Sequence, residues 1–165
     1  MKRIIAGLAV LMMTLGLMTG AFAADPCPVF SGVRWGSSSD LVQIMLGEGI
    51  TMGNKFKMVM RYDSVQYMGH DAMALLYFDK DKLYEIQLMV IDTESKNPQE
   101  TVLSIAYAIR DEYGKPVKGK LDDADEGNAV ERADGDCLLW ITEDTGIWMG
   151  QRGTGVADIR FRQLK

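Results

Sequence analysis

Two segments with helical periodicity, each followed by alternating apolar and polar residues, constrain the fold of this chain most strongly. The first segment starts at Ser38, whose hydroxyl can cap a helix N-terminus, and stops at Gly47. The second has Asn97 as its cap, Pro98 in the first helical position and Glu100 three residues after the cap. We therefore predict two helices, and we expect each to open a unit that continues as strands.

Strands are predicted after both helices, because runs rich in β-branched and aromatic residues are separated by polar turns. In the first run Phe56, Met58 and Met60 lie on one side and basic residues on the other, which is typical of a strand with one face in water. An antiparallel sheet of six or seven strands with two helices on one face satisfies this order, so the predicted fold class is α+β. The predicted strands cover residues 55–62, 72–78, 83–91, 129–133, 137–142, 147–151 and 156–164.

The first 23 residues have the pattern of a cleavable export signal. A basic pair precedes an uncharged apolar run over residues 4–18, and a small-x-small cleavage site ends at Ala23. The apolar run is shorter than the roughly 20 residues that a membrane-spanning helix requires. We therefore predict that residues 1–23 are a signal peptide that is removed, and that the protein is periplasmic or secreted with no membrane anchor after cleavage.

Residues 24–165 are expected to form a single α+β domain of tandem α-β-β-β units, at about 30–92 and 96–165. Two of the 18 basic residues and none of the 23 acidic residues precede this domain, which gives it a net charge of −7. Such an acidic surface repels nucleic acid and anionic lipid headgroups. Neither is therefore expected as a partner.

Cys27 and Cys137 lie near the two ends of this domain. Two cysteines in a small exported domain usually pair, so we predict a structural disulfide between them. The alternative is a free, buried Cys137 with Cys27 on a mobile leader. A redox-active pair is not indicated, because the chain has no C-x-x-C motif.

The sequence points to no catalytic, metal or cofactor site. His70 is the only histidine and lies in a predicted turn, where a histidine is usually just exposed. Acidic residues at 122, 123, 125 and 126 lack the spacing of a calcium loop, which favours a solvated loop. One histidine and two cysteines are also a poor supply of zinc ligands. We therefore predict a protein that is not an enzyme and has no cofactor or metal.

Three tryptophans are candidates for packing or for binding. Trp35 directly precedes the first helix and is predicted to pack as a lid on the sheet. Trp140 and Trp148 fall on one predicted hairpin. If both are exposed, they form the best candidate contact patch, because tryptophan is enriched among residues that dominate protein interfaces.

Several motifs give a resemblance that covers most of the chain, from Phe30 to about Leu164. They are F-x4-W-G-x-S at 30–38, F-D-x-D-K-L at 78–83, Y-G-K-P at 113–116, and Trp140 followed by Ile147. This pattern resembles a group of small, uncharacterised exported bacterial proteins. The order of elements is similar to the helix-plus-hairpin modules of the outer-membrane assembly lipoproteins (SmpA/OmlA) and of β-lactamase inhibitor protein.

The resemblance implies a tandem α/β layout and binding to other proteins, because the better-known relatives bind proteins. The chain departs from the lipoprotein type in having no lipid-anchoring cysteine and two units in place of one, so a role in outer-membrane assembly is not implied. The predicted function is an exported non-catalytic binding module that contacts another cell-envelope protein. The alternative is a periplasmic carrier of a small apolar ligand. The sequence assigns no oligomeric state.

Overall fold

The structure is a computed structural model of the chain, and it describes residues 25–91, 98–119, 121, 137–152 and 155–164. Several sequence predictions lie outside these residues. They are the signal peptide at 1–23, the helix cap at Asn97, the acidic cluster at 122–126 and the strand at 129–133.

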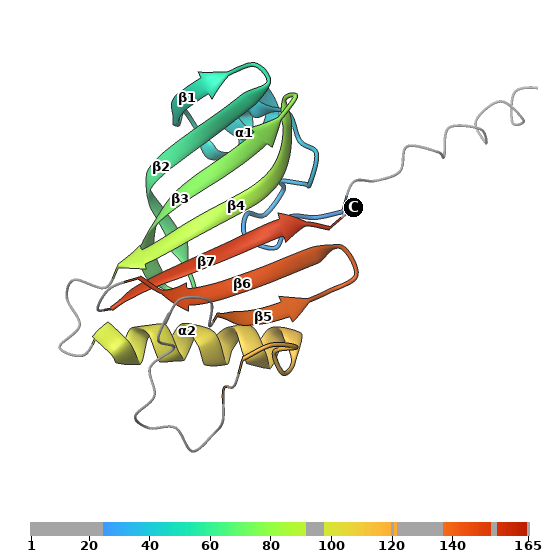
Figure 1. Cartoon of the computed structure of the whole chain (residues 1–165). Helices are drawn as coiled ribbons and strands as arrows, with labels where there is room; N and C mark the ends of the chain where they lie inside the picture. Colours follow the sequence, from blue (N-terminus) through green and yellow to red (C-terminus); the bar gives the residue numbers. More distant parts are fainter. Residues whose placement is uncertain (1–24, 92–97, 120, 122–136, 153–154, 165) are drawn as a thin grey trace, which may run out of the picture.

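In the described residues, seven strands form one antiparallel sheet in the order β1-β2-β3-β4-β7-β6-β5 (Figure 1). Two helices accompany it, α1 (Ser39–Leu46) and α2 (Pro98–Tyr113). The predicted α+β class with a sheet of six or seven antiparallel strands is therefore confirmed. The strands are β1 (Ile50–Asn54), β2 (Lys57–Tyr67), β3 (His70–Asp79), β4 (Lys82–Ile91), β5 (Leu138–Ile141), β6 (Thr145–Gln151) and β7 (Val156–Gln163).

The ends of the helices follow the predicted capping residues. Ser38 is the N-cap of α1, and its hydroxyl accepts a hydrogen bond from the Leu41 N–H at 3.3 Å. Gly47 ends this helix with a φ of 87°, which a residue with a side chain rarely adopts. A further contact that the sequence did not reveal fixes the same helix, because the Asp81 carboxylate accepts from the Ser39 N–H at 2.9 Å. The Ser39 hydroxyl also donates to Asp81 Oδ1 at 2.6 Å, and the bonds from this hydroxyl and from the Ser39 N–H hold the pKa of Asp81 below its usual value.

The first predicted strand needs correction. Phe56 belongs to the turn between β1 and β2, is 69 % exposed, and does not face the core. Strand β1 was not predicted, because Gly53 and Asn54 are residues typical of turns. Asn54 does serve the turn: its side-chain oxygen accepts from the Phe56 N–H at 2.9 Å and the Lys57 N–H at 3.2 Å.

Strand register divides the side chains of the sheet between two faces. At the centre, β4 pairs with β7, and the pairs Leu88–Ile159 and Ile86–Phe161 alternate with Gln87–Arg160. The apolar pairs are buried and belong to the core, whereas the arginine side lies on the opposite face. We call the face of the sheet that carries Arg160 the outer face.

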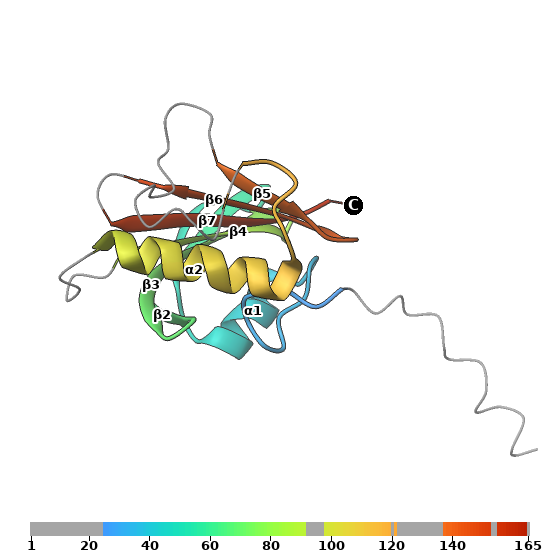
Figure 2. The ribbon, with the colours of Figure 1, turned by 90° about the horizontal axis from the view of Figure 1, so that it is seen from below.

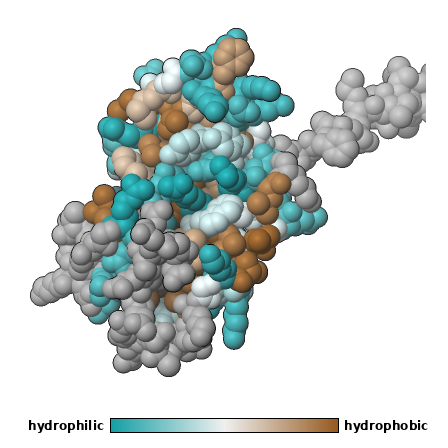
Figure 3. All heavy atoms as spheres, viewed as in Figure 1, coloured by the Kyte–Doolittle hydropathy of each residue, from teal (hydrophilic) through white to brown (hydrophobic). Residues whose placement is uncertain are grey.

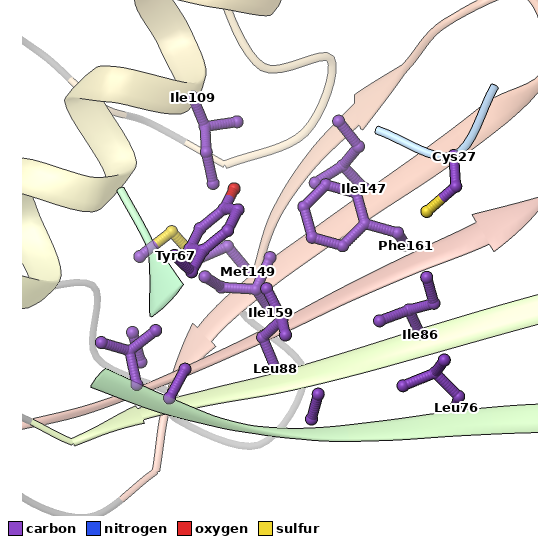
Figure 4. Close-up of a cluster of buried hydrophobic side chains, with 14 of the residues drawn as sticks. Cys27, Tyr67, Leu76, Ile86, Leu88, Ile109, Ile147, Met149, Ile159 and Phe161 are labelled. Atoms are coloured by element: carbon purple, nitrogen blue, oxygen red, sulfur yellow. The ribbon is translucent and has the colours of Figure 1, made fainter. Parts of the chain in front are cut away.

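The core lies on the inner face of the sheet. Figure 2 shows α1 and α2 on the same side of the sheet, and one cluster of buried side chains includes Val42 of α1 and Ile109 of α2. In Figure 4, Ile109 points from α2 toward Tyr67, while Phe161 and Ile147 lie to the right of Tyr67. Tyr67 packs edge-on against Phe161, with their ring centroids 6.1 Å apart.

The segment over residues 25–37 joins the two halves of the sheet. The Gly36 N–H donates to the Leu83 carbonyl at 2.8 Å, which attaches the segment to β4. Trp35 is 1 % exposed, and its indole N–H donates to the Thr145 hydroxyl of β6 at 3.0 Å. Trp35 therefore packs on the sheet as predicted, and it also ties the beginning of the domain to its last hairpin.

Replacing Trp35 by Phe is expected to lower the free energy of unfolding by about 1–3 kcal/mol, because the variant loses a buried hydrogen bond and leaves a gap in the core. Urea unfolding followed by circular dichroism measures this loss. Trp148→Phe is the matched control, because Trp148 lies half-buried on the outer face, and a loss under about 1 kcal/mol is expected there. Equal losses in the two variants would contradict the role given to Trp35.

Candidate functional site

The outer face of the sheet carries the most organised group of polar side chains in the described residues. The register places Gln87, Arg160 and Trp148 in one row across β4, β7 and β6. Glu85 and Arg162 form the neighbouring row. Figure 3 shows this face with hydrophilic side chains over the central strands and apolar ones beside the β5–β6 hairpin. In Figure 2 neither helix lies on this side of the sheet.

A chain of hydrogen bonds runs across the outer face and ends at Asp158. The Tyr77 hydroxyl donates to Gln87 Oε1 at 2.9 Å, and Gln87 Nε2 donates to Asp158 Oδ1 at 2.7 Å. Gln87 and Asp158 are only 3 % and 5 % exposed. Arg152 Nη2 lies 2.9 Å from Asp158 Oδ2, and Arg160 Nε lies 3.8 Å from Asp158 Oδ1. One buried carboxylate thus forms ion pairs with two guanidinium groups.

A second buried carboxylate anchors Arg162 in the same way. Arg162 Nε donates to Glu85 Oε2 at 2.7 Å, and the guanidinium carbon lies 5.9 Å from the centre of the Tyr84 ring. The side chain of Glu85 is 10 % exposed, whereas that of Arg162 is 52 % exposed. The carboxylate therefore lies beneath the guanidinium, which keeps part of its donor edge in solvent.

Trp148 supplies a flat aromatic surface on the same face of the sheet as these arginines. A Cβ added at Gly146 would lie 2.5 Å from an atom of the Trp148 ring and 3.3 Å from Leu164. The indole therefore occupies the space that a side chain at position 146 would need. Trp148 pairs with Arg160 across β6 and β7, so the two residues are cross-strand neighbours on the outer face.

This arrangement is suited to binding. Guanidinium groups held in place match carboxylates geometrically, and an adjacent indole adds apolar contact area. We call Trp148, Arg152, Arg160 and Arg162 the arginine–tryptophan site. The sequence contains a signal for this site, because Asp158, Arg160 and Arg162 alternate along one strand.

The predicted contact patch of Trp140 and Trp148 is wrong for Trp140. In the β5–β6 hairpin Trp140 pairs with Ile147, and Trp148 pairs with Leu139. The two tryptophans therefore point to opposite faces of the sheet. Trp140 is 1 % exposed, and its indole N–H donates to the Gly114 carbonyl at 2.8 Å, which places it in the core. Trp148 alone remains on the outer face.

The disulfide predicted between Cys27 and Cys137 is absent from the structure, where both thiols are free. Cys27 is held within its own loop, because its N–H donates to the Val33 carbonyl at 2.9 Å and its sulfur accepts from the Val29 N–H at 3.4 Å. Figure 4 shows its sulfur near Phe161 and Ile147. Cys137 directly precedes β5. The two cysteines are thus placed by different parts of the fold, and neither reaches the other.

Burial also determines the chemistry of Cys27. It raises the pKa of the Cys27 thiol, and it raises the pKa of the Tyr113 hydroxyl nearby. Both groups therefore stay protonated near neutral pH. A nucleophilic cysteine requires the opposite shift, so Cys27 is a packing residue in this environment.

The other candidate residues lie apart from the arginine–tryptophan site. His70 is the first residue of β3, opposite Tyr67 at the β2–β3 turn, and is half-buried. Among residues 25–91, 98–119, 121, 137–152 and 155–164, no three His, Cys, Asp or Glu side chains gather as a metal site would require. In the same part of the chain, no helix has the length and hydropathy needed to cross a bilayer.

Comparisons with known proteins add no relative to this description. No family model, no curated protein and no solved structure matches the chain.

Replacing Asp158 by Ala is expected to lower the free energy of unfolding by about 2–3 kcal/mol, because Gln87 Nε2 loses its buried acceptor and Arg152 its partner. Asp63→Ala is the matched control, since Asp63 also pairs with an arginine of the sheet but its side chain is 57 % exposed. A loss below about 1 kcal/mol is expected there. Chemical unfolding of both variants measures the difference, and comparable losses would contradict the anchoring role of Asp158.

Cys27 is expected to resist alkylation in the folded protein, because it is buried and little of it is thiolate. In a Cys137→Ser variant, the rate of reaction with iodoacetamide at pH 8 should rise at least about tenfold when urea unfolds the protein. Mass spectrometry of the labelled protein measures the rate. Rapid labelling under native conditions would show that Cys27 is accessible and refute its assignment to the core.

Proposed function

We propose that this protein is an exported, non-catalytic binding module that contacts another cell-envelope protein through its arginine–tryptophan site. One observation carries the proposal: buried Asp158 and Glu85 form ion pairs with three half-exposed arginines on the outer face of the sheet, where Arg160 is the cross-strand neighbour of Trp148. Export is supported by the signal pattern of residues 1–23.

Prior anchoring of the arginines favours binding. Ordering a long, flexible side chain at an interface costs about 0.5–1.5 kcal/mol, and part of that cost is already met when a carboxylate fixes the side chain beforehand. Arginine and tryptophan are also enriched among the few residues that provide most of the binding energy in protein interfaces. The site therefore combines the residue types and the rigidity that a docking surface requires.

The charge of the site indicates the chemistry of the partner surface. Arg152, Arg160 and Arg162 face two carboxylates, so the site has a local positive excess on a domain whose expected net charge is −7. A complementary surface would present aspartate or glutamate side chains around an apolar group that covers the indole. An acidic protein segment satisfies both requirements.

Capture from envelope extract with single variants tests the proposal. The immobilised wild-type protein is expected to retain a reproducible partner, and Trp148→Ala and Arg160→Ala are each expected to reduce its recovery at least about tenfold. Arg110→Ala is the matched control, because Arg110 lies on α2 and stacks on Tyr107 away from the outer face. Quantitative mass spectrometry measures recovery, and circular dichroism checks that each variant is folded.

Two outcomes would count against the proposal. One is an empty capture, and the other is a partner whose recovery is the same with Trp148→Ala, Arg160→Ala and the wild type. A small apolar molecule released from the purified protein in denaturing mass spectrometry would favour the carrier function instead.

A further inference from the structure

Strand β1 is an open edge of the sheet. Among the described residues β2 is the only strand beside it, and all five residues from Ile50 to Asn54 are exposed. The backbone N–H and C=O groups of β1 that point away from β2 can therefore form hydrogen bonds with an added strand.

This edge carries neither the charges nor the proline that often prevent such pairing. Natural edge strands tend to carry lysine, proline or inward-pointing charges. The β1 sequence Ile-Thr-Met-Gly-Asn has no charge and no proline, and Ile50 and Met52 are 50 % and 43 % exposed. The edge is therefore both open and apolar.

Exposed apolar side chains are concentrated in the part of the sequence around β1. Eleven large hydrophobic residues are exposed in the described part of the chain, and six of them fall between residues 41 and 56. Ile44 on α1, at 78 %, is the most exposed of all. Removing such side chains from water favours association. The six are Leu41, Ile44, Met45, Ile50, Met52 and Phe56.

The opposite edge of the sheet is partly covered by the chain itself. The Val117 N–H donates to the Leu139 carbonyl of β5 at 2.7 Å, and the Leu139 N–H donates to the Lys118 carbonyl at 3.0 Å. Both backbone groups of Leu139 are thus occupied. A head-to-tail chain of copies, joined from β1 to β5, is hindered by this cover. Pairing of β1 with β1 uses the same surface twice and closes at two copies.

The charges that flank β1 are complementary to those of a second copy. Glu48 precedes the strand, Lys55 and Lys57 follow it, and all three are exposed. Two antiparallel copies related by a two-fold axis at Met52 pair Ile50 of one copy with Asn54 of the other, so that Glu48 lies just beyond this last pair, beside the β1–β2 turn that carries Lys55. Opposite charges then meet at both ends of an uncharged centre, which favours this pairing.

We propose that β1 pairs antiparallel with β1 of a second copy of this chain, and that the two sheets become continuous in a two-fold symmetric dimer. Two arginine–tryptophan sites would then lie on one assembly. The inference does not depend on the proposed function, because the edge and the outer-face site use different residues.

Sedimentation velocity of the purified protein over a concentration series tests the dimer. The wild type is expected to shift from monomer to dimer as its concentration rises. Met52→Lys is expected to raise the dissociation constant at least about tenfold, because two lysines would face each other at the axis. Ile91→Lys is the matched control, since Ile91 is 46 % exposed but lies at the end of β4, and its dissociation constant should equal that of the wild type.

A mixture of two variants gives the sharpest result. Met52→Lys and Met52→Glu are each expected to be monomeric alone and to form a heterodimer when mixed, because opposite charges then face each other. Amide hydrogen exchange of wild-type residues 49–55 should also slow as the concentration rises, which tests the edge without any substitution. Melting curves check that the variants are folded.

Three results would overturn the proposal. One is a wild type that stays monomeric at every concentration, which would also be the result if β1 receives a strand from a different protein. Another is a dimer that Met52→Lys does not weaken, and the third is a dimer without slower exchange at β1. The Met52→Lys variant keeps the arginine–tryptophan site intact. If this variant still captures an envelope partner, the failure of the dimer proposal is distinguished from failure of the proposed function.

Discussion

The antiparallel ladder between β4 and β7 is the contact on which the rest of this structure depends. Its seven residue pairs join the strands that follow α1 to the strands that follow α2. Its partners lie far apart in the chain, 77 residues in the case of Glu85 and Arg162, so closing the ladder has a substantial entropic cost. Burial of the apolar pairs on its inner face, such as Leu88 with Ile159, provides the compensating free energy.

The same ladder also organises the outer face. Because side chains alternate along a strand, each apolar residue that fixes the core also fixes a polar neighbour on the other side. Gln87 lies between Ile86 and Leu88, and Arg160 lies between Ile159 and Phe161, so the positions of the polar pair follow from the packing of the apolar ones. A binding surface built in this way moves little relative to the core, which is the property that precise recognition requires.

The parts of the fold that depend on local signals could be predicted from the sequence. Ser38 and Gly47 mark the ends of α1 because a cap needs only its own helix, and the end of α2 at Gly114 follows the same rule. It was harder to predict which face of the sheet a side chain lies on, because that depends on the length of the turn between two paired strands. The β5–β6 turn pairs Trp140 with Ile147, which sends Trp148 to the other face. The pairing of Arg162 with Glu85 could not be predicted, since these two residues meet only when two distant strands pair.

The hydrogen bond from Trp35 to Thr145 spans 110 residues of the chain. The segment that holds Trp35 is among the first parts of the domain to be synthesised, yet its place exists only after β6 has formed. Folding of this domain therefore cannot finish on a partial chain, because the Trp35 indole gains its acceptor only when the last hairpin is present. Completion of the fold is thus a late event.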